Sequence, residues 1–258
     1  MIKLVIFDWA GTTVDFGSMA PVNAIEQLFN EYEIPVTDEE IRKPMGTEKR
    51  EHLSTMLGFD RIRDAWVEKF TSAPSEEDVD KMYARFKEIL IEGIPDNSHV
   101  KPGTVETVAQ LRERGIKIGT TTGYNREMAQ LAANTAKAEG FDPDFTATVT
   151  DTNNIGRPFP YMIFKNMEAL NVLSVKEVVK VGDTLTDIEE GINAGAIAIG
   201  LIEGSSQLGL KESELNALSA EAKDARFAEV REAYKQVGAH YVVDTMSDLI
   251  EIIDNLNK

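Results

Sequence analysis

Five short, mostly apolar runs punctuate the chain and are typical of strands buried on both faces of a sheet. They lie at 3–7, 116–121, 146–149, 178–181 and 196–201. Segments with helical spacing separate them: Val105, Val108 and Ala109 recur at helical intervals before a stop at Gly115, and Ser174–Glu177 has the pattern of a helix-capping box. Strands and helices that alternate in this way build parallel sheets. The sequence therefore predicts an α/β fold with a doubly wound parallel sheet.

The segment between the first and second apolar runs breaks this alternation. It holds no convincing strand but several helix starts, among them Pro21 and the capping boxes Thr37–Glu40 and Ser75–Asp78. A crossover between parallel strands needs only a few tens of residues, so about eighty are too many for one connection. We expect an inserted helical cap domain. The predicted boundaries are 1–16 with 100–258 for the core and 17–99 for the cap.

Composition and charge narrow the class of partner. The 258 residues carry 27 Lys and Arg against 44 Asp and Glu, a net charge of −17, which argues against binding nucleic acid or an anionic membrane surface. With no cysteine, the chain cannot use a disulfide scaffold, a thiolate nucleophile or a Cys-ligated metal site. No apolar run approaches the ~18 residues of a membrane span, and the N-terminus lacks a signal-peptide pattern. We expect a cytoplasmic protein with a small-molecule partner.

Polar residues follow the apolar runs at the positions where open α/β sheets bind ligands. Asp8 follows the first run, Thr122 the second, and Asp183 and Asp187 the fourth, while Arg157 precedes a helix between them. Alone, Asp183 is equally well explained as a helix cap, and Thr122 and Arg157 are better explained as a turn residue and a surface charge. Together, carboxylates with an open face suit Mg²⁺, and a cation with a hydroxyl suits a phosphoryl group. One carboxylate could then act as a nucleophile through an aspartyl-phosphate.

These residues and motifs resemble the haloacid dehalogenase superfamily. The segment IFDWAGTTVD around Asp8 is similar to its first motif, Thr122 in TTTGY to its second, Arg157 to its third, and GDTLTD with Asp183 to its fourth. The resemblance covers the whole chain and implies a Rossmann-like core, Mg²⁺ and covalent catalysis by Asp8. The motifs of the other common α/β chemistries, GxxxxGK[ST], GxGxxG and GxSxG, do not occur in the sequence.

One position departs from the superfamily pattern. Its phosphatases usually carry a second aspartate two residues after the nucleophile, as the acid for the leaving alkoxide, and here that position is Ala10. Because alanine cannot donate a proton, either the leaving group needs none from this position or activity has been lost. A carbon leaving group would need none if its electrons were drawn into a neighbouring iminium.

An iminium requires a lysine amine, and RKPMGTEKREH in the predicted cap offers Lys49, spaced to share a helix face with Met45 and His52. A lysine forms a Schiff base readily when its pKa falls from ~10.4 to about 7–8. Arg42, Lys43 and Arg50 are neighbouring cations that favour such a shift. A solvated basic helix face is the alternative interpretation of this stretch.

The combination of DWAGTTVD, RKPMGTEKREH, TTTGY, GRP and KVGDT is similar to a family of carbon–phosphorus bond hydrolases within the superfamily. This resemblance implies hydrolysis of phosphonoacetaldehyde to acetaldehyde and phosphate, with Asp8 as nucleophile and Lys49 as Schiff-base lysine. It implies Mg²⁺ ligation by Asp8, Asp183 and the Ala10 carbonyl. The other implied roles are phosphonyl binding by Thr122 and Arg157, support of the metal site by Asp187, lining of the site by Met45 and Tyr124, and proton transfer by His52.

Two other functions stay open at this point. One is a Mg²⁺-dependent phosphomonoesterase that acts on a small phosphate ester with its acid elsewhere, and the other is a catalytically silent binding module. The intact residues at four motifs argue against the silent module. The resemblance also implies a homodimer through the cap, for which Phe70, Tyr83 and Phe86 are candidates, although burial within the cap would explain each of them equally.

Overall fold

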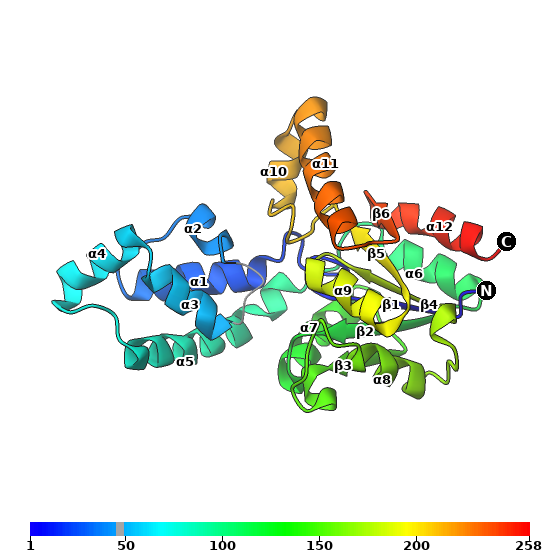
Figure 1. Ribbon diagram of the computed structural model, residues 1–258, viewed down its shortest axis with the longest axis horizontal. Coiled ribbons are helices and arrows are strands. Elements are labelled where there is room, and N and C mark those ends of the chain that lie inside the picture. Colours follow the sequence, from blue (N-terminus) through cyan, green and yellow to red (C-terminus); the bar gives the residue numbers. More distant parts are fainter. Residues whose placement is uncertain (45–48) are drawn as a thin grey trace. The chain divides into compact units, whose positions relative to one another are not determined.

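The chain forms two compact units. The computed structural model describes residues 1–44 and 49–258. We call Met1–Ser18 with Pro95–Lys258 the core unit, and Met19–Ile94 the cap unit. Figure 1 shows the elements of both units along the chain.

The boundaries between the units follow helix ends rather than the predicted positions after residues 16 and 99. Helix α1 (Met19–Glu31) opens the cap unit and helix α5 (Glu76–Gly93) closes it. The Gly17 N–H donates to the Gly204 carbonyl at 2.8 Å, which ties residue 17 to the core unit. The loop residues at the boundary have no helical spacing that would show to which unit they belong. Their hydrogen bonds place them in one unit or the other.

The core unit is built on a six-stranded sheet in the order β3-β2-β1-β4-β5-β6, and every pair is parallel. The strands are β1 (Leu4–Phe7), β2 (Lys117–Thr122), β3 (Phe145–Thr148), β4 (Val178–Gly182), β5 (Ile197–Leu201) and β6 (Tyr241–Val243). This is the strand order of a doubly wound, Rossmann-like sheet. The predicted fold class is confirmed, and the five predicted strands are all present.

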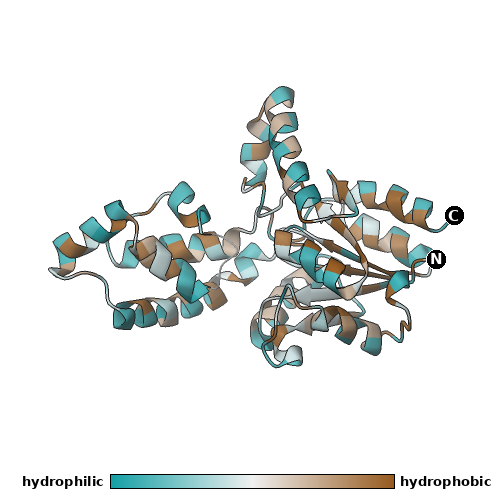
Figure 2. Ribbon diagram, viewed as in Figure 1, coloured by the Kyte–Doolittle hydropathy of each residue, from teal (hydrophilic) through white to brown (hydrophobic). Residues whose placement is uncertain are grey.

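Helices cover the sheet on both faces. The helices of the core unit are α6 (Thr104–Glu113), α7 (Arg126–Ala138), α8 (Tyr161–Ala169), α9 (Leu185–Ala194), α10 (Glu212–Ala217), α11 (Ala220–Gln236) and α12 (Leu249–Leu256). Helix α8 packs along β1 to β3 and against α9, which lies along β4 and β5, while α6 packs on β2 and against α12. All four residues of β1 are fully buried, as a strand covered on both faces requires, and Figure 2 shows brown, hydrophobic stretches within the sheet.

The register of the central strands sets the position of the site. Phe7 at the end of β1 pairs with Thr120 of β2 and with Val181 of β4. The residues that follow these three therefore emerge at one edge of the sheet. That edge is the carboxyl end of the strands, where α/β proteins bind their ligands.

Two local expectations fail. Strand β6 was not predicted, because it has only three residues and lies at the edge of the sheet with Tyr241 exposed. The predicted capping box at Ser174 is wrong: residues Val175–Glu177 form a single 3-10 turn, and the Ser174 side chain makes no capping bond. The Glu177 carboxylate pairs with Lys3 at 2.6 Å instead.

The cap unit is helical, as predicted. Its helices in the described residues are α1, α2 (Asp38–Arg42), α3 (Lys49–Leu57), α4 (Asp60–Phe70) and α5. Helices α1 and α3 both pack on α5, and the capping boxes of Thr37 and Ser75 are both formed. Phe86 is buried inside this unit, whereas Phe70 stays 38% exposed and packs on Trp66. Nowhere in 1–44 or 49–258 does a helix combine the length and apolar character that a bilayer crossing needs.

Candidate active site

Asp8 is a buried carboxylate at the carboxyl end of β1. It is 5% exposed, and its backbone N–H donates to the Val181 carbonyl of β4 at 2.9 Å. Its Oδ1 accepts a hydrogen bond from Arg157 Nη2. Burial raises the pKa of Asp8 to about 7, because the loss of water outweighs the attraction of Arg157. Without a bound cation, Asp8 is therefore partly protonated at neutral pH.

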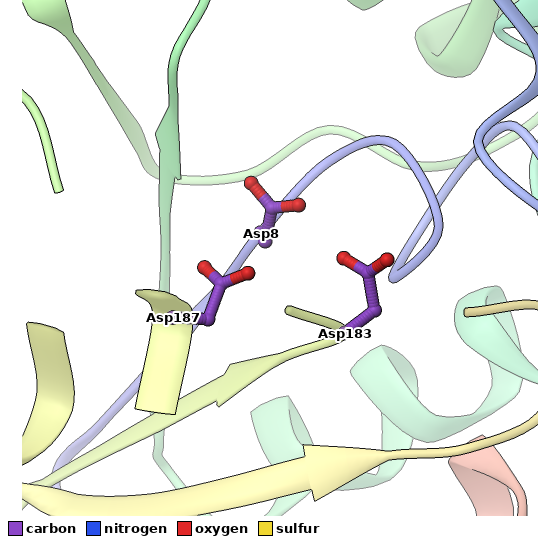
Figure 3. Close-up of side chains that lie close together, drawn as sticks. All are labelled: Asp8, Asp183 and Asp187. Carbon is purple, nitrogen blue, oxygen red and sulfur yellow. The ribbon is translucent and has the colours of Figure 1, made fainter. Parts of the chain in front are cut away.

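Three carboxylates from separate segments converge at this edge. Asp8 ends β1, Asp183 follows β4, and Asp187 lies in the first turn of α9. Their carboxyl groups are drawn together in Figure 3, and one oxygen of each lies within 4.8 Å of the others. All three are buried. A set of clustered carboxylate oxygens is the donor set of a hard divalent cation.

Asp183 is oriented by neutral donors. Thr12 Oγ1 donates to its Oδ1 at 3.0 Å, and both the backbone N–H and Oγ of Ser206 donate to its Oδ2 at 2.8 and 2.7 Å. The buried Tyr234 hydroxyl donates to the Asp183 carbonyl at 2.6 Å. Sequence analysis missed these three partners. Ser206 follows the fifth apolar run, so a search for polar residues after strand ends could have found it. Tyr234 comes from a distant helix, and such a search could not find it.

The loop after Asp8 passes so close to Asp183 that only glycine fits. Gly11 has φ +82°, in the left-handed region, and a Cβ placed there would lie 2.2 Å from Asp183 Oδ2. The buried Lys101 ammonium donates to the Gly11 carbonyl and, at 2.6 Å, to the Glu203 carbonyl. The loop that carries Ala10 is therefore fixed from both sides.

Thr122 and Tyr124 lie where the second strand ends. Thr122 is buried, and its Oγ1 accepts a hydrogen bond from the Tyr124 N–H at 3.1 Å. Burial and the negative charges of Asp15 and Asp8 raise the pKa of Tyr124. Its phenol therefore keeps its proton next to the carboxylates and can act as a hydrogen-bond donor there.

Arg157 contacts carboxylates through two of its nitrogens. Its Nε lies 3.1 Å from Asp187 Oδ1 and 3.2 Å from Glu190 Oε2, while Nη2 binds Asp8 and donates to the carbonyl and hydroxyl of Thr121 at 2.8 and 2.9 Å. Burial by itself would lower the pKa of Arg157, but the carboxylates around it raise this pKa by more. The net pKa lies above its ordinary value, so Arg157 remains a cation. Within the described part of the chain, Nη1 forms no hydrogen bond.

A buried lysine and glutamate stand behind Arg157, and sequence analysis missed both. Lys180 Nζ lies 2.8 Å from Asp187 Oδ1 and 3.5 Å from Glu190 Oε2, and it donates to Thr121 Oγ1 at 2.9 Å. A lysine in the middle of an apolar run was the available signal, because a buried ammonium requires carboxylate partners. Glu190 is one of several polar residues in its helix, so nothing in the sequence marks it as buried.

The buried charges at this edge do not balance. Five buried carboxylates belong to the core unit, and three cations, Lys101, Lys180 and the largely buried Arg157, oppose them. Burial lowers the pKa of Lys101 to about 8, so it is still mostly protonated at neutral pH. The carboxylates are Asp8, Asp15, Asp183, Asp187 and Glu190. When all five ionise, they outnumber these three cations, and the three that converge, Asp8, Asp183 and Asp187, would attract a divalent cation.

The cap unit holds the other two described residues that the sequence assigned to the site. His52 is fully buried on α3, and burial together with the nearby Lys49 charge lowers its pKa to about 4, so its imidazole is neutral. Arg50, expected to act on Lys49, binds Glu76 and Asp80 at 2.7 Å each, so its charge is largely compensated. Met45 lies outside the described residues.

Comparisons with known proteins identify the family of this chain. A haloacid dehalogenase-like hydrolase family model matches residues 2–195. A phosphonoacetaldehyde hydrolase of Lysinibacillus sphaericus is 45% identical over 257 residues, which span this whole chain and 96% of that relative. A bifunctional phosphonoacetaldehyde hydrolase/aminoethylphosphonate transaminase of Clostridioides difficile is 44% identical over 252 residues, 98% of this chain, and the chain spans 40% of its length.

A solved structure is similar over nearly the full length. The phosphonoacetaldehyde hydrolase-like protein from Oleispira antarctica has 40% sequence identity and a TM-score of 0.88. The match covers 99% of this chain and 92% of that one. Fold and sequence therefore point to the same family.

The raised pKa of Asp8 predicts a stability that depends on pH in the absence of divalent cations. The folded carboxyl binds its proton up to about pH 7, whereas the unfolded one releases it near pH 4, so the stability of the protein falls as the pH rises between these values. Asp8→Asn removes this effect. In EDTA at pH 8 the variant should be more stable by about 2–4 kcal/mol, and the gain should vanish near pH 4.

Urea unfolding at several pH values measures this difference. The matched control is Asp224→Asn, at an exposed position on α11, which should change nothing. A gain for Asp8→Asn that is the same at pH 4 and pH 8 would contradict the buried, proton-binding state of Asp8.

Proposed function

The chain belongs to the phosphonoacetaldehyde hydrolase family of the haloacid dehalogenase-like hydrolases, and on that basis we propose that it hydrolyses the carbon–phosphorus bond of phosphonoacetaldehyde to acetaldehyde and phosphate. The observation that carries the proposal is an intact aspartate and arginine site with Ala10 at the position of the superfamily's proton donor. A phosphate ester leaves as an alkoxide that needs this proton. A carbon leaving group attached to a protonated imine needs none.

We propose Mg²⁺ as the divalent cation of the carboxylate cluster. Asp8, Asp183 and the Ala10 carbonyl would hold it, and its positive charge would stabilise the phosphonyl oxygens. The close ion pairs of Asp187 with Lys180 and Arg157 support a role beside the ligands rather than among them. The three converging carboxylates support a dication over a monovalent ion.

The core residues act on phosphorus. Thr122 and Arg157 bind the phosphonyl oxygens, and the unused Nη1 of Arg157 supports this role. Tyr124, with its phenol protonated, lines the site. An oxygen of Asp8 attacks phosphorus in line with the carbon–phosphorus bond, forming an aspartyl-phosphate that water then cleaves to phosphate.

The cap residues act on the aldehyde carbon. Lys49 condenses with the aldehyde and releases water, giving a protonated imine that accepts the electron pair of the breaking carbon–phosphorus bond. The resulting enamine is protonated on carbon, and hydrolysis of the imine releases acetaldehyde and frees Lys49. His52 carries protons in these steps, and its neutral imidazole next to Lys49 supports that role. We retain Met45 as a residue that lines this site.

Lys49→Arg should abolish turnover of phosphonoacetaldehyde, because a guanidinium keeps the charge but forms no imine. The control Lys81→Arg, at an exposed position on α5, should retain full activity. Borohydride reduction with substrate, followed by peptide mass spectrometry, should give a stable adduct on Lys49 in the wild type only. Substantial turnover by Lys49→Arg would refute the imine route, and cleavage of sugar phosphates that survives this change would favour the phosphomonoesterase.

Mg²⁺ together with inorganic phosphate should stabilise the protein. At about 100 times the dissociation constant, binding adds roughly 2.7 kcal/mol, which raises the melting temperature by about 5–10 °C for a protein of this size. Asp183→Asn should abolish the rise, and Asp224→Asn should preserve it. Differential scanning calorimetry with and without EDTA measures the effect. An equal rise in Asp183→Asn would contradict metal binding at the cluster.

We also propose a homodimer formed through the cap unit. Phe70 and Val67 on α4 are partly exposed and support such an interface, whereas Phe86 is buried inside the unit and cannot contribute. Sedimentation velocity should find a dimer that Phe70→Glu weakens. Leu173→Glu, at a residue of the core unit that is 91% exposed, should leave it intact. A monomeric wild type would contradict this proposal.

A further inference from the structure

Glu190 is a fully buried carboxylate to which neither the sequence nor the proposed reaction gives a role. It lies one turn after Asp187 on α9, and its Oε2 accepts a hydrogen bond from Arg157 Nε at 3.2 Å. Its other described partners are Thr121 at 3.3 Å and Lys180 at 3.5 Å. None of these three groups reacts in the proposed mechanism, so Glu190 acts through them.

We propose that Glu190 is the positioning residue that holds Arg157 in the orientation that binds the phosphonyl oxygens, and that Lys180 keeps Glu190 in place. The proposal rests on the proposed function only in giving Arg157 that role. It deepens the function by naming the side chain that fixes the Nε group of Arg157.

Arg157 is held at two nitrogens of its guanidinium. Nη2 binds the nucleophile Asp8, and in the low dielectric of a buried site this attraction is strong. Nε donates to Glu190, so the guanidinium is fixed at a second point and does not turn about its contact with Asp8. These two contacts leave Nη1 without a hydrogen bond in the described chain and open to a ligand oxygen.

Lys180 makes this arrangement possible. Glu190 Oε2 and Asp187 Oδ1 both lie near Arg157 Nε, and two buried carboxylates this close repel each other. Lys180 lies between them, with its Nζ 2.8 Å from Asp187 and 3.5 Å from Glu190. Thr121 completes the cluster, because its hydroxyl accepts from Lys180 and Arg157 and donates to Glu190. Two cations and two anions form a neutral group behind the site.

Glu190→Gln tests the role directly, since it preserves shape and removes the charge that attracts Arg157. The matched control is Glu189→Gln, the same change one residue earlier on α9 and outside the cluster. A double variant, Lys180→Met with Glu190→Gln, removes one cation and one anion together. The remaining pair, Arg157 and Asp187, stays balanced in charge. Circular dichroism verifies the fold, and if Glu190→Gln does not fold, Glu190→Asp takes its place, since it keeps the charge but withdraws it by one methylene.

Two measurements follow on each variant. Calorimetric titration with inorganic phosphate in Mg²⁺ should show affinity weakened about 10-fold or more in Glu190→Gln and unchanged in Glu189→Gln. The kcat/KM for phosphonoacetaldehyde should fall about 10- to 100-fold in Glu190→Gln, while borohydride still traps the adduct on Lys49. Retained trapping separates a misplaced Arg157 from a general loss of structure.

The outcomes discriminate between the explanations. Phosphate affinity in Glu190→Gln, or in its substitute Glu190→Asp, equal to that of Glu189→Gln would overturn the proposal. So would recovery of affinity in the double variant, because Glu190 would then serve only to neutralise Lys180. If the wild type neither traps nor cleaves phosphonoacetaldehyde, the proposed function fails, but the phosphate titration still decides whether Glu190 positions Arg157.

Discussion

An excess of buried carboxylates over buried cations at the carboxyl edge of the sheet is the constraint on which the site depends. Such an excess is costly in a protein interior, and most of the local structure limits its cost. Register brings the carboxylates to one edge, because Phe7 pairs with Thr120 and Val181 on its two sides. The glycine at position 11 lets the chain pass over Asp183 without a clash. The remaining imbalance is the driving force for binding a divalent cation.

Asp183 and Asp187 lie four residues apart, yet their surroundings shift their pKa values in opposite directions. Burial raises the pKa of Asp183, and the hydroxyls and N–H groups that bind it are neutral donors that compensate only partly. Burial also opposes ionisation of Asp187, but the charges of Arg157 and Lys180 outweigh it and lower the pKa of this group. The charge of Asp187 is therefore already neutralised by the protein, whereas ionised Asp183 would need an external cation to neutralise it.

The sequence predicts the site residues that follow strand ends. It does not reveal the contacts that depend on packing between distant segments. Asp8, Thr122 and Asp183 were found because apolar runs mark strands and ligands collect where strands end, and Arg157 because it precedes a helix in the same region. Tyr234 reaches the Asp183 carbonyl from α11, and no local pattern connects these segments. Strand β6 was missed because three edge residues carry too little hydrophobic signal. Lys180 was visible as a charge within an apolar run, but its partner Glu190 could only be identified in the folded chain.

The charge excess also links the readiness of the nucleophile to the cation. With its pKa raised to about 7, Asp8 without a cation is protonated in a large fraction of molecules at neutral pH, and a protonated carboxyl is a poor nucleophile. A dication beside it would favour the ionised form, just as it would relieve the repulsion from Asp183 and Asp187. Arg157 cannot do this alone, because its charge is shared with Asp187 and Glu190. The same imbalance that attracts a cation thus keeps the nucleophile largely inactive until the cation is bound.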